Sequence, residues 1–122
     1  MCPKCYDSLS FNDIRAERII EGVNIFCAGS YDKNLQKLIR GLKYHNQKEL
    51  AFYLAKFMYE YWVRIGDERD FQVVAVPLHF NRIKKRKYNH MELVVDEFCK
   101  LSGLTPNFEL IKRIKDTKPQ YK

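Results

Sequence analysis

A dense run of cationic side chains follows an apolar segment in the second half of the sequence. Five of the six residues from Arg82 to Lys87 are lysine or arginine. The preceding residues 71–76 are mostly apolar and lead into Pro77, as is typical of a strand buried on both faces of a parallel sheet. Ligands of such sheets bind in the loops beyond the carboxyl ends of the strands, where backbone amides and a helix N-terminus add positive character. The pattern favours a phosphate or pyrophosphate site, and a solvated basic turn is the alternative.

A second candidate site involves the cysteines. Cys2 and Cys5 have the spacing of a metal knuckle, in which two thiolates on one tight turn supply half of a tetrahedral Zn²⁺ site. Cys27 and Cys99 lie in apolar segments without a neighbouring thiol, so we expect them to be buried structural residues, remote from the pair. The sequence therefore predicts a half-site that binds zinc weakly.

Composition and charge indicate a globular chain of one domain with an anionic partner. Of the 122 residues, 46% are hydrophobic and 30% are charged. No apolar run reaches the roughly 18 residues that cross a bilayer, and the N-terminus lacks the pattern of a secretion signal, so we expect a cytoplasmic protein. Residues 71–122 carry 11 cationic against 5 acidic side chains, whereas residues 1–70 carry 11 against 10. This asymmetry indicates phosphate groups, nucleic acid or an acidic surface as the partner of the second part.

Periodic apolar residues predict three helices that would position these groups. The first follows a possible N-cap at Asp32 and turns one face inward, formed by Leu35, Leu38, Ile39 and Leu42. The second covers residues 47–65 and ends at Gly66, with seven inward residues: Leu50, Leu54, Phe57, Met58, Tyr61, Trp62 and Ile65. The third ends at Gly103 and turns inward Met91, Val94, Val95, Phe98 and Leu101. Residues 23–28, 71–76 and 108–111 read as strands, and this alternation indicates an open α/β sheet.

Four motifs, taken together, resemble the ComF family. Val74–His79 followed by Arg82, Arg86 and Tyr88–Asn89 is similar to that family's Val-Pro-Leu-His strand end and its arginine-rich turn. Residues 29–31, 38–44 and 113–120 resemble its early tyrosine, its Leu-Lys-Phe helix end and its Arg-x-Arg-x-Thr-x-x-Gln segment. The chain departs from the pattern at Lys87, where the family has glycine, and at His90, where it has glutamine.

The resemblance implies a fold and a set of site residues. The fold would be α/β, an incomplete type I phosphoribosyltransferase-like parallel sheet with flanking helices, preceded by a remnant zinc-ribbon knuckle. Residues 1–22 would form the partial zinc-ribbon element, with Cys2 and Cys5 as its metal half-site, and residues 23–122 the N-terminal part of the phosphoribosyltransferase-like domain. Pyrophosphate or another anion would contact Pro77, Leu78, His79, Arg82, Arg86 and Asn89. A mobile loop would contribute Arg113, Lys115, Thr117 and Gln120.

The same resemblance implies two different functions. One is a glycosyltransferase-type protein that, in its complete form, binds phosphoribosyl pyrophosphate with Mg²⁺. The paired carboxylates and the Thr/Gly-rich loop that hold the phosphoribosyl group in that fold are absent from these 122 residues, so we expect a fragment that is inactive alone. The alternative is a protein that handles single-stranded DNA with competence proteins during DNA uptake, without catalysis. In either case a strand at residues 71–76 without all its neighbours would leave an apolar patch uncovered and would promote association.

Overall fold

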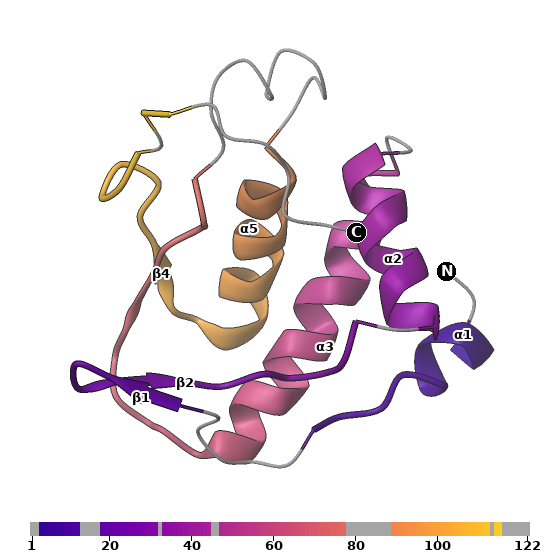
Figure 1. Ribbon diagram of the computed structural model, residues 1–122, viewed down its shortest axis with the longest axis horizontal. Coiled ribbons are helices and arrows are strands. Elements are labelled where there is room, and N and C mark those ends of the chain that lie inside the picture. Colours follow the sequence, from indigo (N-terminus) through magenta and orange to yellow (C-terminus); the bar gives the residue numbers. More distant parts are fainter. Residues whose placement is uncertain are drawn as a thin grey trace.

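A computed structural model describes residues 3–12, 18–31, 33–44, 47–77, 89–112 and 114–115. Within these ranges the elements follow in the order α1 (Pro3–Asp7), β1 (Arg18–Ile20), β2 (Val23–Ile25), α2 (Lys33–Tyr44), α3 (Leu50–Ile65), β3 (Gln72–Val73), α5 (His90–Ser102) and β4 (Thr105–Pro106) (Figure 1). Helices and two small two-stranded sheets make this a mixed α/β arrangement, which confirms the predicted class at that level. In the described ranges, none of the helices has the length and apolar character needed to cross a membrane.

Helix α3 is the centre of the fold, with α2 packed on one side and α5 on the other (Figure 1). Leu38 and Leu42 from α2 and Val94 from α5 are at most 2% exposed, and they belong to one apolar cluster. The side chains of Ala51 and Ala55 on α3 are buried in the same cluster. Small residues at a helix contact allow the helix axes to approach closely, so α3 can hold both neighbours.

The helix ends agree with the sequence. Gly66 and Gly103 follow α3 and α5 with φ angles of 73° and 77°, in the left-handed region that glycine adopts without strain. The Gly103 N–H donates to the Cys99 carbonyl at 2.9 Å. The three predicted helices are thereby confirmed, although α3 begins at Leu50 rather than at residue 47.

The inward faces of the helices agree with the prediction at most positions and differ at one. Phe57 and Tyr61 are 2% and 3% exposed, and the Phe57 ring stacks on Phe11 with centroids 4.5 Å apart. These rings are core residues rather than a platform for stacking bases. Met58 was predicted to point inward and is 37% exposed, because it faces an open groove instead of a packed neighbour.

Strands β1 and β2 form an antiparallel hairpin that the sequence reading did not predict in full. Glu21 and Gly22 connect them with φ angles of 49° and 80°, the left-handed pair that a two-residue hairpin turn requires. The predicted strand at 23–28 is reduced to Val23–Ile25, and Cys27 beyond it is exposed rather than buried. The prediction for Cys27 was wrong because this hairpin forms a two-stranded sheet of its own and β2 is not a covered strand.

Strands β3 and β4 are parallel, and α5 lies between them in the sequence. The three elements therefore form a β-α-β unit. Gln72 pairs with Thr105 and Val73 with Pro106. The prediction of a strand over 71–76 buried on both faces was wrong in extent, because only two residues pair with β4 and Val76 is 62% exposed. No strand forms at 108–111 either.

An Asx turn explains why the chain leaves the sheet before residue 108. The Asn107 N–H still bonds to the Val73 carbonyl at 2.9 Å. The side-chain oxygen of Asn107 then accepts a hydrogen bond from the Glu109 N–H at 3.0 Å. Such a side-chain contact to the backbone two residues on favours a turn over an extended strand.

Candidate functional site

The carboxyl ends of β3 and β4 form the edge to which the sequence assigned its anion-binding residues. Because the two strands are parallel, the chain segments that follow Val73 and Pro106 leave from the same edge. Residues 74–89 connect β3 to α5, and residues 107–115 follow β4. Pro77 is half-buried in the first segment, and Lys115 is exposed in the second. The two cation-bearing segments therefore begin side by side.

Asn89 has a structural role at this edge. It is the N-cap of α5, and its side-chain oxygen accepts a hydrogen bond from the Met91 N–H at 3.1 Å. The oxygen is thus committed to the helix end, and the amide group is the part of this side chain that could donate to an anion. The buried His90 follows, at 5% exposure.

Most of the other residues predicted for the anion site and for the mobile loop lie outside the described part of the chain. These are Leu78, His79, Arg82 and Arg86 in the first segment and Arg113, Thr117 and Gln120 in the second. Their assignment stays a prediction from the sequence, and the fold adds that each of the two groups follows one of two paired parallel strands along the chain.

The described residues do not make up a complete zinc site. Cys5 is exposed on α1, where its carbonyl accepts a hydrogen bond from the Ser8 hydroxyl at 2.6 Å. Cys2 lies outside the described residues, so the knuckle geometry is untested. Within the described ranges no three His, Cys, Asp or Glu side chains gather as metal ligands, whereas a structural Zn²⁺ ion takes four. Cys5 could serve as one ligand at most.

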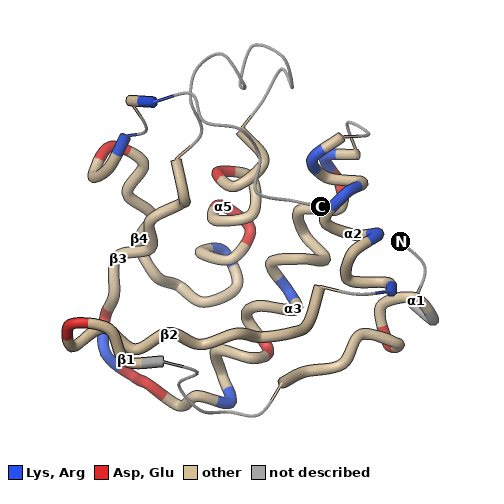
Figure 2. The backbone as a smooth tube through the Cα atoms, viewed as in Figure 1, with Lys and Arg blue, Asp and Glu red and all other residues tan. Residues whose placement is uncertain are grey.

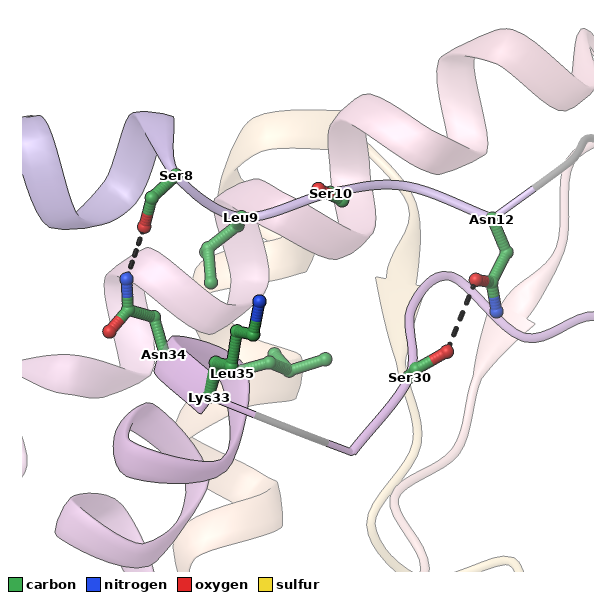
Figure 3. A pocket seen from close by; sticks show the side chains of 8 residues that line it. All are labelled: Ser8, Leu9, Ser10, Asn12, Ser30, Lys33, Asn34 and Leu35. Carbon is green, nitrogen blue, oxygen red and sulfur yellow. Dashed lines mark hydrogen bonds between the residues drawn. The ribbon is translucent and has the colours of Figure 1, made fainter.

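A polar pocket of about 220 Å³ lies where the segment after α1 passes the beginning of α2 (Figure 3). Its lining comprises Ser8, Leu9, Ser10, Asn12, Ser30, Lys33, Asn34 and Leu35. The Asn34 amide donates to the Ser8 hydroxyl, and the Ser30 hydroxyl donates to the Asn12 side-chain oxygen at 3.5 Å. Lys33 is the one titratable side chain among the described residues of this lining, and the polar groups around it suit a small polar ligand.

Sequence reasoning did not identify this pocket. It included Ser30 in a family motif but gave no role to Ser8, Ser10 or Asn12. A signal was present, because residues spaced by two along an extended segment share one side, and three short polar side chains recur at that spacing.

Lysine and arginine residues recur along helix α2, as the blue segments of its backbone in Figure 2 show. Its sequence contains no acidic residue, and Lys33, Lys37 and Arg40 are all exposed. Their spacing of four and three residues places them along one side of the helix. Two partly exposed tyrosines, Tyr31 at 54% and Tyr44 at 45%, flank this row, and the Arg40 guanidinium lies 5.8 Å from the Tyr44 ring centre.

The buried thiol of Cys99 and the buried hydroxyl of Tyr6 each lose a proton in alkali, and we expect this to lower the stability of the folded protein. Burial raises the pKa of the Cys99 thiol, and the Asp96 carboxylate raises it further. Burial also raises the pKa of the Tyr6 hydroxyl, with Glu60 adding to the effect. The pKa of each group is therefore higher in the folded state than in the unfolded state. Such a group contributes stability that is fully present below its unfolded pKa, which is about 8.5 for cysteine. This stability is lost as the pH rises through the folded pKa.

We therefore expect the free energy of unfolding to decline above about pH 8.5, measured by urea denaturation at a series of pH values. Cys99→Ala should make this decline shallower, and the matched change at the exposed Cys27 should not. Stability that is constant up to pH 10, or an equal effect of the two substitutions, would contradict the assignment.

Comparisons of the chain with models of known families, with curated proteins and with solved structures gave no match.

Proposed function

We propose that this chain is a ComF-like protein of the phosphoribosyltransferase type that binds pyrophosphate, or the pyrophosphate group of phosphoribosyl pyrophosphate, beside the carboxyl ends of β3 and β4. The observation that supports this proposal is the parallel pairing of the two strands. Each strand leads into a segment rich in lysine and arginine, and both segments begin at the same edge, where open α/β sheets bind their ligands. The first segment contains the cations between Arg82 and Lys87, and the second contains Lys112, Arg113 and Lys115.

The chemistry of these groups suits a strongly anionic ligand. Arginine forks match phosphate oxygens, and lysines add point charges without a fixed geometry. In a complete enzyme of this type, Mg²⁺ would enter with the substrate, and cations at this edge would stabilise the pyrophosphate that leaves. Asp96 and Glu97 do not supply the missing ribose carboxylates, because Asp96 is exposed on α5 and Glu97 pairs with Lys100 at 3.5 Å. The proposed activity of this chain is therefore binding without turnover.

Calorimetric titration with pyrophosphate tests the proposal. We expect saturable binding, and we expect the double variant Arg82→Ala, Arg86→Ala to weaken it by at least tenfold, since a hydrogen bond to a charged group contributes about 1.5–3 kcal/mol. The matched control removes two cations from α2 instead, as Lys37→Ala, Arg40→Ala, and should leave the affinity nearly unchanged. Equal losses in both variants would mean that net charge alone attracts the ligand, and the proposed site would be wrong.

A second candidate function, the handling of single-stranded DNA, is favoured by the surface of α2. The exposed row of Lys33, Lys37 and Arg40 could follow a phosphate backbone, and the tyrosines at either end could stack on bases. This surface is formed by a different element from the edge of β3 and β4, so the two functions can be tested by separate substitutions.

A further inference from the structure

The polar pocket beside the beginning of α2 has walls from two separate parts of the chain (Figure 3). Two hydrogen bonds join these walls, from the Asn34 amide to the Ser8 hydroxyl and from the Ser30 hydroxyl to the Asn12 side-chain oxygen. The paired residues lie 26 and 18 positions apart in the sequence. The fold therefore holds the walls together before a ligand enters, which lowers the entropic cost of binding.

Two donor groups in the described lining are available to a ligand. Among the described residues, no hydrogen bond or ion pair engages the Lys33 ammonium or the Ser10 hydroxyl. Figure 3 shows the Lys33 ammonium directed toward the segment of residues 8–12. An ammonium group has three donors and no acceptor, and a hydroxyl can donate one hydrogen bond. A ligand rich in acceptor oxygens would satisfy both groups.

The charge of the pocket favours an anion. Lys33 is positive, and none of the other described lining residues is ionic. Residues 33–35 also begin α2, and the N–H groups of a first helical turn, which lack partners within the helix, add positive character. The pocket does not depend on this helix end alone, because residues 8–12 supply two hydroxyls and an amide from another part of the chain.

We propose that this pocket binds the phosphate group of a small phosphate monoester. Such a group presents three strong acceptor oxygens, which suits donors that come from two walls better than the two oxygens of a carboxylate do. The volume of about 220 Å³ is below the roughly 300–1,000 Å³ of pockets for drug-sized ligands. It exceeds the space of a few ordered waters, at about 30 Å³ each, so the polar remainder of a small ester fits beside the phosphate.

This site is separate from the edge of β3 and β4, to which the proposed pyrophosphate site belongs. Its lining comes from residues 8–12 and 30–35, and neither strand contributes to it. Binding at the two places can therefore be measured independently.

NMR titration of the isotope-labelled chain tests the proposal by locating the binding. The probes are inorganic phosphate, glycerol phosphate and glycerol, each added to the Arg82→Ala, Arg86→Ala variant so that the edge of β3 and β4 does not compete. We expect saturable shifts of the amide signals of residues 8–12 and 30–35 with both phosphates, tighter binding of glycerol phosphate, and no shifts with glycerol. If inorganic phosphate binds and glycerol phosphate does not, the proposed ester is wrong.

Substitutions in the same background test the role of the lysine. Lys33→Gln should weaken the binding of glycerol phosphate by about tenfold, because a hydrogen bond to a charged group is lost, and Ser10→Ala should weaken it by about fivefold. Lys33→Arg should retain most of the affinity. Lys37→Gln is the matched control, since it removes the same charge from the same helix outside the lining, and it should bind as the background variant does.

The three substituted positions are exposed, so far-UV circular dichroism should show unchanged helix content. Equal losses in Lys33→Gln and Lys37→Gln would mean that the net charge of α2 attracts the phosphate, and the proposed pocket would be wrong. Glycerol that binds as tightly as glycerol phosphate, or phosphate-dependent shifts confined to other parts of the chain, would also overturn the proposal.

Discussion

Replacing Leu42 by alanine should lower the free energy of unfolding by about 3 kcal/mol, a large share of the 5–15 kcal/mol typical of a domain. Leu42 is 0% exposed and lies in the cluster that joins α2, α3 and α5. The contact beside it is tight, since a methyl group added at Gly41 would lie 2.6 Å from the Leu50 Cδ1 atom. Surroundings packed this closely cannot collapse fully into the space that the leucine leaves, so a cavity adds to the lost transfer free energy.

Leu110→Ala provides the matched control, because this leucine is 61% exposed. The same atoms are removed, and the expected change stays within about 0.5 kcal/mol. Urea denaturation followed by circular dichroism measures both variants at one protein concentration. Equal losses at the two positions would show that the core is not centred on the contact of α2 with α3.

The helices could be predicted because each carries its own evidence. The inward rows of α2 and α5 repeat every three or four residues, and glycines stop α3 and α5 where the left-handed conformation is needed. Tertiary packing determines which residues of each apolar row are buried. Met58 belongs to the apolar pattern of α3, yet it faces the groove, because periodicity does not say which part of a face finds a partner.

The strands were harder to predict because pairing depends on distant residues. Residues 71–76 are apolar throughout most of their length, but the ladder that they form is limited by β4, which is only two residues long. β4 itself contains Pro106, which lacks an N–H group and counts against a strand in any local reading. The hairpin could have been recognised, because Glu21–Gly22 separates Ile19–Ile20 from Val23 at a two-residue spacing.

The candidate site also combines features that local sequence indicates with features that depend on the pairing of distant residues. Local sequence shows that the basic segment follows an apolar run, but it does not show the parallel pairing of β3 with β4, from which a second cation-containing segment begins at the same edge. The N-cap role of Asn89 had a local signal, an asparagine directly before a periodic helix. The polar pocket had a weaker one, because residues 26 positions apart, Ser8 and Asn34, must meet before it exists.

The two candidate functions differ most in their response to salt. If the row of Lys33, Lys37 and Arg40 holds single-stranded DNA, binding releases condensed counterions from the strand. Three neutralised phosphates give a slope of about −2 in the logarithm of affinity against the logarithm of salt concentration, or a loss of about 20-fold between 50 and 200 mM. Pyrophosphate has no condensed counterion layer, so its binding should depend less steeply on salt.

Fluorescence anisotropy with a labelled oligothymidine at several salt concentrations measures this slope. We expect the triple variant Lys33→Gln, Lys37→Gln, Arg40→Gln to make the slope shallower by about two units, which would assign the strand to α2. The control removes the same charge elsewhere, at the exposed Arg64, Arg69 and Lys100, and should leave the slope unchanged. If Arg82→Ala, Arg86→Ala removes the binding and the α2 variant does not, DNA and pyrophosphate share the edge of β3 and β4. The row on α2 would then have no part in either function, because its cations would contribute neither to the affinity nor to the salt dependence.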